Sequence, residues 1–358
     1  MPNVWMRLAT GAATVGCAAL IALIFFGRDL SQISLQLDSA RLQNFKIVFL
    51  SIILEALPFL LVGVLISALL QAFVSDKLIQ KLTPKNPIAG ILFGSLLGII
   101  LPLCECGMIP IVRRLIRKGL PAYIGIIYIV AGPIINPVVF GATFAAFRTN
   151  KDLAYSRFYL AFLVSVALGL ILYRFMKKNP LKQDRQSQQQ HTQITDGHHH
   201  HHHHHLDHHH HHGHDHSNEA SLGKKLADTP GHAAEEFFDM GKYLILGSFI
   251  TGLLQTFITR ASFSAVADQE LLSHLFMMGF AYALSLCSTS DAFVAASFNS
   301  MFPPAALLSF LVFGPMLDLK NTLMMLAVFR KKFVLKFSLA IAALVLLGSI
   351  LFDHLGFV

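Results

Sequence analysis

The chain has 358 residues, of which 54% are hydrophobic and only 13% are charged, and its mean hydropathy is +0.58. A soluble protein carries about 25% charged residues, so this composition excludes an ordinary soluble domain and indicates a membrane protein. The net charge of +8 requires no nucleic-acid partner, because lysine and arginine collect in the cytoplasmic loops of membrane proteins. We expect the lipid bilayer, and no nucleic acid, among its partners.

Apolar segments follow one another along the chain, and many reach the length of about 20 residues that spans a bilayer. The first, residues 6–27, resembles a signal peptide, but it is long and further apolar segments follow, so we interpret it as a membrane helix. The others lie at residues 46–73, 88–110, 121–147, 157–175, 239–259, 271–299, 304–328 and 333–352. The predicted fold class is an all-α polytopic membrane protein.

A polar segment, about residues 177–236, separates the fifth apolar segment from the sixth. Its low hydrophobicity and lack of periodicity predict a disordered loop. Its run of histidines resembles a purification tag, but tags usually lie at a terminus, so we favour a natural loop that collects metal loosely. The candidate ligands there include His198, His200, His208, His210, His214 and His216.

The segments on either side of this loop repeat each other. Gly63 matches Gly247 at an offset of 184, Cys104 matches Cys287 at 183, and GPIIN matches GPMLD at 182. Matches in this order, with slips of one residue, indicate an internal duplication. The predicted organisation is an N-terminal helix and loop, a first membrane repeat, a disordered His-rich cytoplasmic loop and a second membrane repeat, at residues 1–45, 46–176, 177–236 and 237–358.

Basic residues predict the topology of the repeats. The positive-inside rule places the basic segments near residues 113–118, 177–185 and 330–336 together in the cytoplasm. This placement requires residues 271–299, and by the repeat residues 88–118, to enter and leave the membrane on one side. The repeats are then inverted, with re-entrant or broken helices, as in many transporters. Full spans with parallel repeats are the alternative.

Each of these two segments carries polar residues at its predicted turn. The first reads LPLCECG, and its proline and glycine favour a helix break around Cys104, Glu105 and Cys106. Two thiolates with a carboxylate suit zinc or copper(I), provided that the backbone is not a regular helix. The alternative is that the cysteines are small core residues and the glutamate pairs with an arginine.

The second segment offers a thiol, hydroxyls and a carboxylate in succession, at Cys287, Ser288, Thr289, Ser290 and Asp291. Such groups are costly in lipid and more often mark a substrate or ion path. The hydroxyls could instead bond to helix carbonyls, whereas the carboxylate requires a partner. Because Cys106 aligns with Thr289 in the repeat, the expected site is asymmetric, with two thiols from the first half and one thiol and a carboxylate from the second.

The two Gly-Pro motifs predict helix breaks that place Asn136 or Asp318 beside an opening in the backbone. Helix ends and unwound carbonyls form ion sites in transporters, so both residues are candidates for the path. The alternative is a structural kink in which the polar side chain satisfies freed amides. Glu55 is either a relay carboxylate or an interfacial residue.

No catalytic constellation is visible in the sequence, which has no P-loop and no hydrolase elbow, so we do not expect an enzyme or a resident cofactor. Three of the four cysteines lie in the two motifs, and the fourth is Cys17, so a disulfide framework is not expected.

The motifs resemble the ArsP/YraQ-like family of bacterial permeases, in particular its YcgR-like branch. The resemblance rests on LPLCECGMIPIVRRLIRKGLP, AGPIINPVV, LSLCSTSDAFVA and FGPMLDLKN, and it covers residues 47–352. It implies a secondary permease of the bacterial inner membrane with two related halves. Some relatives export organoarsenicals, and others are tied to transition-metal handling and encoded beside a second small membrane protein. The glutamate between the cysteines, where the arsenical exporters tend to have serine, argues against arsenical export here.

We therefore expect a secondary permease for a transition-metal ion, zinc above all, with a site between the two repeats. Its path is predicted to include Cys104, Glu105, Cys106, Asn136, Cys287, Ser288, Ser290, Asp291 and Asp318. The metal ligands expected among them are Cys104, Glu105, Cys106, Cys287 and Asp291. The alternatives are an efflux permease for organoarsenicals or other small thiophilic solutes, and a metal-binding sensor or assembly subunit without transport. A second small membrane subunit and an oligomer are compatible with each.

Overall fold

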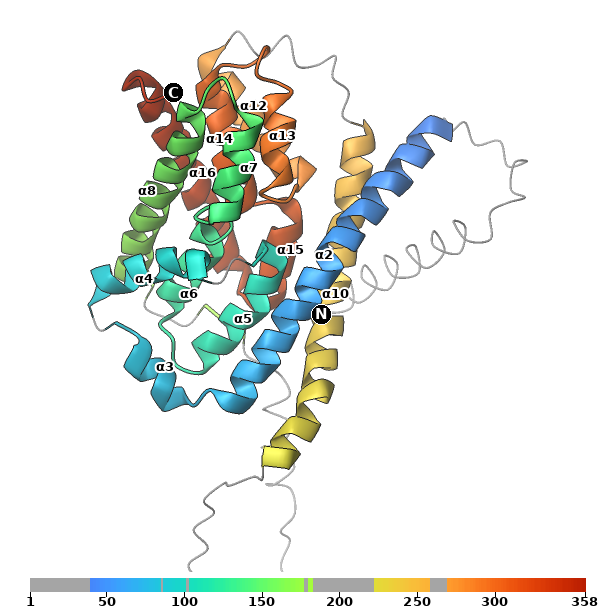
Figure 1. Cartoon of the computed structure of the whole chain (residues 1–358), viewed down its shortest axis with the longest axis vertical. Coiled ribbons are helices and arrows are strands. Elements are labelled where there is room, and N and C mark those ends of the chain that lie inside the picture. Colours follow the sequence, from blue (N-terminus) through green and yellow to red (C-terminus); the bar gives the residue numbers. More distant parts are fainter. Residues whose placement is uncertain (1–38, 85, 101–102, 177–179, 183–221, 258–268) are drawn as a thin grey trace, which may run out of the picture.

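The computed structural model describes residues 39–84, 86–100, 103–176, 180–182, 222–257 and 269–358 (Figure 1). Within these ranges the regular structure is helical, and five helices are long and apolar enough to cross a membrane. The predicted all-α polytopic fold is therefore confirmed. The predicted helix at residues 6–27, Cys17 and the histidines of the loop lie outside the described residues.

The described helices follow the same order in the two halves of the chain. The first half contains α2 (Ser39–Phe73), α3 (Asp76–Leu82), α4 (Pro87–Ile100), α5 (Glu105–Arg117), α6 (Ala122–Ala131), α7 (Pro137–Ala146) and α8 (Asp152–Phe175). The second half contains α10 (Leu222–Phe257), α12 (Glu270–Leu284), α13 (Ser290–Ala296), α14 (Pro304–Met316), α15 (Leu319–Val328) and α16 (Lys331–His354). Except for α3, each described helix of the first half has a counterpart in the second, as the internal duplication predicts.

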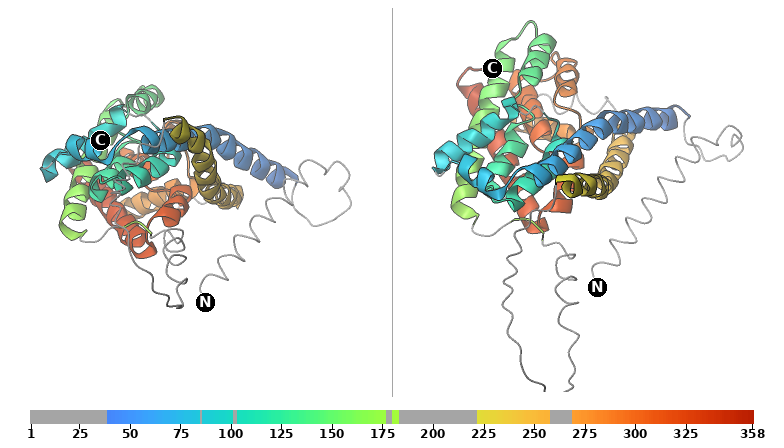
Figure 2. Two further views of the ribbon diagram at one scale, coloured as in Figure 1. Left: turned by 90° about the horizontal axis from the view of Figure 1, so that it is seen from below. Right: turned by 60° about the horizontal axis from the view of Figure 1, so that its bottom comes forward.

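The long helices α2 and α10 are counterparts that pack side by side in opposite directions (Figures 1 and 2). Near the start of α2, the ring of Phe45 lies 5.5 Å from the ring of Phe249, between centroids. Near its other end, the Ser67 hydroxyl donates to Glu236 Oε2 at 3.0 Å. Because the counterparts are antiparallel, the two repeats are inverted. Glu236 is part of α10, which begins at Leu222. This helix therefore starts before residue 237, where the second membrane repeat was predicted to begin.

An engineered disulfide is expected to test this antiparallel packing. A Cβ atom built on Gly252 of α10 lies 3.6 Å from the Cβ of Phe49 of α2, and disulfides form across about 3.5–4.5 Å. In a background with the native cysteines replaced by serine, Phe49→Cys with Gly252→Cys should join the two halves. A non-reducing gel after cleavage at a protease site introduced between the halves measures the bond. Phe49→Cys with Gly241→Cys is the control, since a Cβ on Gly241 meets no atom within 4 Å; equal cross-linking in both pairs would contradict the packing.

The segment that contains α12 and α13 reverses direction at its polar turn. The rings of Phe280 and Phe298 lie 5.6 Å apart, and those of Phe276 and Phe302 lie 5.9 Å apart, between centroids. The inner pair, Phe280 with Phe298, and the outer pair, Phe276 with Phe302, both bracket residues 285–289. The segment after this turn therefore runs back alongside α12 in the opposite direction. This is the reversal predicted for residues 271–299.

The segment that contains α4 and α5 makes the corresponding reversal. Cβ atoms built on Gly94 and Gly98 of α4 meet first Ile124 and then Gly132 along α6, so these two helices run in the same direction. Along α5, the contacts run the other way, because Met108 adjoins Gly132 whereas the later residues of α5 adjoin Gly125. The helices α4 and α5 therefore run in opposite directions, as predicted for residues 88–118. We call the reversal between α4 and α5 the first hairpin and the reversal between α12 and α13 the second hairpin.

Both predicted helix breaks are present in the structure. Asn136 is the N-cap of α7, and its side chain accepts a hydrogen bond from the amide of Val138 at 2.9 Å. Asp318 is the N-cap of α15, and its Oδ1 accepts from the amide of Asn321 at 2.5 Å. Each polar side chain thus satisfies an amide that the break leaves without a helical partner.

Residues 180–182, the described part of the second basic segment, lie beside the start of the third, residues 330–336. The amide of Arg330 donates to the carbonyl of Pro180 at 3.0 Å, and an antiparallel bridge joins Leu181 to Phe329. This contact agrees with the positive-inside prediction, which places the two segments on the same side of the membrane.

The two halves interlock through their hairpins. The helix α5 of the first hairpin packs against α15 of the second half, and α13 of the second hairpin packs against α7 of the first half. Each hairpin therefore lies against the broken helix of the opposite repeat, and this exchange positions the polar residues described below.

Candidate functional site

The two cysteine motifs meet at one small cavity between the halves. The cavity has a volume of about 40 Å³, which exceeds the space of about 10–15 Å³ that one water molecule requires. Its lining comes from α2, the two hairpin turns and α15: Ile52, Glu55, Ala56, Phe59, Cys104, Glu105, Cys106, Ser285, Leu286, Cys287 and Lys320. We call it the cysteine pocket, because all three described cysteines line it.

The first hairpin presents both of its cysteines to the pocket because the helix begins between them. Cys104 is the N-cap of α5 and has extended backbone angles, whereas Cys106 lies within the first turn. The amides of Gly107 and Met108 donate to the Cys104 carbonyl at 3.1 and 3.2 Å, which fixes this start. The predicted break in the helix is therefore what allows two cysteines separated by one residue to share a cavity.

The second hairpin turns at Ser285, whose φ of 47° lies in the left-handed region that is uncommon for residues other than glycine. The Ser285 hydroxyl accepts from the amide of Lys320 at 3.2 Å and donates to the carbonyl of Tyr282 at 3.4 Å. The amide of the Gln255 side chain donates to the carbonyl of Leu284 at 2.7 Å. These bonds hold the turn that carries Cys287.

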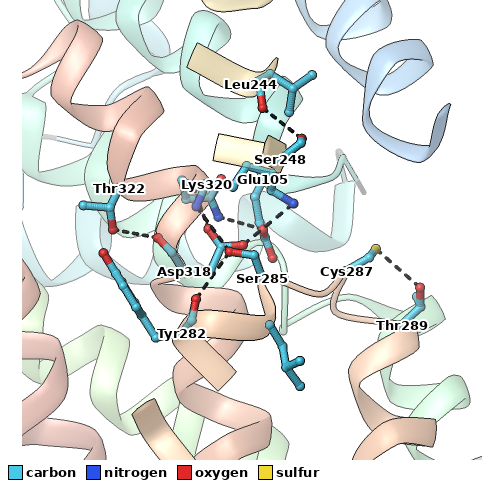
Figure 3. A network of polar contacts seen from close by, with 12 residues as sticks. Glu105, Leu244, Ser248, Tyr282, Ser285, Cys287, Thr289, Asp318, Lys320 and Thr322 are labelled. Carbon is cyan, nitrogen blue, oxygen red and sulfur yellow. Dashed lines mark hydrogen bonds and ion pairs between the residues drawn. The ribbon is translucent and has the colours of Figure 1, made fainter. Parts of the chain in front are cut away.

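Buried charged groups lie together at one side of the pocket, where Figure 3 shows Glu105, Asp318 and Lys320 close to one another beside the turn at Ser285. Glu105 is 4% exposed, Asp318 is inaccessible and Lys320 is 6% exposed. The Lys320 ammonium lies 3.7 Å from Asp318 Oδ2, and the Asn321 side-chain amide donates to Glu105 Oε2 at 2.7 Å. The pocket, together with the adjacent Asp318, therefore combines thiols with two buried carboxyl groups and one ammonium group in a region of low dielectric constant.

Several oxygen atoms next to the pocket have unused hydrogen-bonding capacity. Glu105 Oε1, Asp318 Oδ2 and Asn321 Oδ1 are buried and have no hydrogen-bond partner among the described residues. Buried acceptors without partners cost free energy, and a cation could satisfy them. The described side chains do not, however, form a group of three or more histidine, cysteine, aspartate or glutamate residues arranged to hold a metal ion. The ligands would have to converge when an ion binds.

Asp291 lies in a different cluster. It is 2% exposed, and its Oδ2 accepts from Arg157 Nη2 of α8 at 2.7 Å. Arg157 also donates to the Thr143 hydroxyl at 2.7 Å and to the Ser288 carbonyl at 3.2 Å. This buried cluster ties the second hairpin to α7 and α8 of the first half, and none of its residues lines the cysteine pocket.

The structure therefore divides the predicted path residues. It brings Cys104, Glu105, Cys106 and Cys287 together, with Asp318 beside them. Asn136, Ser288, Ser290 and Asp291 do not line the cysteine pocket. Glu55, which the sequence left open, does line it.

Sequence reasoning missed Lys320 and Asn321. A lysine two residues after Asp318, within an apolar helix, was the available signal, because a charge in a membrane segment requires a partner. Asn321 is 216 positions from Glu105 in the sequence, and no local sequence pattern reveals a contact at that separation.

Comparison with known proteins identifies the family. A family model described as a predicted permease, of the ArsP type, matches residues 41–354. The chain belongs to this permease family. This permease is 43% identical over 305 residues to the YcgR protein of Bacillus subtilis strain 168, covering 85% of this chain and 95% of that protein. It is 36% identical over 290 residues to a Streptococcus mutans protein named as a subunit of a two-component membrane permease complex, covering 81% and 88%. No solved structure matches it.

The family resemblance predicted from the motifs is thus confirmed, and the permease is a multi-pass bacterial membrane protein. In transporters built from inverted repeats, cargo binds at the repeat interface, beside broken helices. The cysteine pocket has this position in the permease.

Proposed function

We propose that this permease is a secondary transporter, not an enzyme, and that it moves a transition-metal ion, zinc first among the candidates, through the cysteine pocket. The observation that carries the proposal is that cysteines from both inverted halves line one cavity. Thiolates are the ligands that select zinc and copper(I) over the harder cations.

The donor set suits a transported zinc ion. Cys104, Cys106 and Cys287 would supply three sulfur atoms and Glu105 one oxygen atom, which is the four-coordinate number typical of zinc. A site whose ligands converge only on binding can also release its ion, as transport requires. Because the ligands come from both halves, movement of one repeat against the other would open and close the site.

The neighbouring residues have supporting roles in this proposal. Glu55 of α2 lines the pocket and is exposed, so it would be an early carboxylate on the route of an incoming cation. Asp291 would hold the second hairpin in place through Arg157. The His-rich loop would concentrate metal at the cytoplasmic side. The name of the Streptococcus mutans relative supports a second membrane subunit for this permease as well.

Zinc flux into vesicles containing the purified permease tests the assignment. Cys104→Ser and Cys287→Ser, one from each half, should each lower the flux by at least about ten-fold, because changes even in the surroundings of metal ligands cost about 10–100-fold. Cys17→Ser is the matched control and should retain the wild-type flux.

The outcomes separate the competing functions. Zinc flux that is unchanged in both pocket variants would refute the site. Flux of methylarsenite in place of zinc would favour the organoarsenical exporter, and stoichiometric zinc binding without flux would favour a sensor or assembly subunit.

A further inference from the structure

Lys320 is a buried ammonium group inside the proposed cargo site. It is the second residue of α15, its side chain is 7% exposed, and it lines the cavity with the cysteines and Glu105. A Cβ atom built on Gly247 of α10 lies 3.1 Å from the Lys320 Cα, so the helix above it packs closely. A buried charge costs free energy unless it is compensated, so groups near the pocket must compensate the Lys320 ammonium.

The carboxylate groups near Lys320 are the same groups that would attract a cargo cation. Asp318 Oδ2 lies 3.7 Å from the Lys320 Nζ, and both Asp318 Oδ2 and Glu105 Oε1 lack hydrogen-bond partners among the described residues. These oxygen atoms attract a cation, but an incoming ion meets a positive charge already present. Cargo and ammonium therefore compete for the same negative groups.

A comparison with the other buried ion pair shows that the Lys320 pair is the looser one. Arg157 approaches Asp291 to 2.7 Å and donates to two further oxygen acceptors, so its planar group is held from several sides. The Lys320 Nζ lies 3.7 Å from Asp318 Oδ2, beyond hydrogen-bonding distance, and this residue, whose side chain is flexible, lines a cavity. The Arg157–Asp291 pair therefore suits a fixed link between the halves, whereas the Lys320–Asp318 pair can separate to let another cation take the place of the ammonium group.

We propose that Lys320 is the internal counter-cation of the cysteine pocket. Its ammonium group compensates part of the negative charge of Glu105 and Asp318 while the pocket is empty, and it moves aside when a cargo cation binds. This inference rests on the proposed function and adds the residue that limits cargo affinity. The competition keeps binding weak enough for release, and it leaves the empty pocket with less uncompensated negative charge while the two halves rearrange.

Protection of Cys287 measures zinc binding at the pocket itself, and the His-rich loop takes up zinc equally in every variant compared. Increasing zinc should protect Cys287 from a small maleimide in the full-length, purified permease, and peptide mass spectrometry gives the half-protecting concentration. Lys320→Met and Lys320→Gln should lower this concentration by at least about ten-fold, because they remove a like charge from a desolvated site. Lys320→Arg, which retains the charge, should not lower it.

Lys242→Met is the matched control, because Lys242 is exposed on α10 and pairs with Asp239 at 2.7 Å, away from the pocket residues. It should leave the half-protecting concentration unchanged. If Lys320→Met fails to fold, Lys320→Gln decides the result.

The possible failures are distinguishable. Half-protecting concentrations that are unchanged or higher in the neutral variants would overturn the role of Lys320, while protection and flux in the wild type would still support the permease. Absence of protection and of zinc flux in the wild type would overturn the proposed cargo, and the Lys320 inference with it.

Discussion

Asp291→Asn is expected to lower the free energy of unfolding by about 3–5 kcal/mol, because it leaves the Arg157 guanidinium buried without its charged partner. The two side chains are 2% and 3% exposed, and 2.7 Å separates the paired atoms. Arg157 joins α7, α8 and the second hairpin, so its displacement would also loosen the contact between the halves. Thermal unfolding in detergent, with the single and double variants, measures the effect.

The double variant Arg157→Met with Asp291→Leu should recover much of the loss, since apolar residues often replace a buried ion pair without net cost. Asp239→Asn is the control, because it removes one partner of an exposed pair and should change stability by less than about 1 kcal/mol. An Asp291→Asn protein that is as stable as this control but no longer transports zinc would return Asp291 to the cargo path that the sequence predicted.

Gly63→Ala should lower the free energy of unfolding by about 1–3 kcal/mol and reduce zinc flux, because the added methyl group overfills a packed contact. A Cβ atom at this position would lie 2.5 Å from the Cα and the carbonyl oxygen of Gly107, and backbone atoms cannot rotate aside. The helix α2 would have to move away from the first hairpin and from the pocket wall that it forms. Unfolding in detergent and flux in vesicles measure the two effects.

Gly241→Ala provides the opposite expectation on the counterpart helix. A Cβ atom there meets nothing within 4 Å, and alanine in a helix is favoured over glycine by about 0.5–1 kcal/mol. This variant should therefore be at least as stable as the wild type. If Gly63→Ala behaved in the same way, the close approach of α2 to the first hairpin would be wrong.

Local signals in the sequence predicted the framework of the site. Prolines and glycines beside polar residues predicted the breaks at Asn136 and Asp318, because these residues determine backbone geometry within a few positions. The uneven distribution of lysine and arginine predicted that both cysteine segments turn back on themselves. The fold and the meeting of Cys104 with Cys287 could therefore be anticipated.

The partners of the buried charges could not be predicted in this way. Asp291 meets Arg157 across 134 positions, and Glu105 meets Asn321 across 216 positions. Contacts at such separations leave neither a period nor a characteristic spacing in one sequence. For this reason the sequence placed Asp291 in the metal site, whereas the structure pairs it with an arginine outside the cysteine pocket.

The sequence by itself determined the membrane class, the duplicated plan, the helix breaks and the pairing of the two cysteine motifs as counterparts, because composition, repetition and backbone-directing residues are local properties. Only the tertiary structure decided which charges share the pocket. Inversion of the repeats packs α5 against α15 and α13 against α7, so each hairpin takes its polar partners from the opposite half. Lys320 thereby lies beside Glu105, while Arg157 lies beside Asp291.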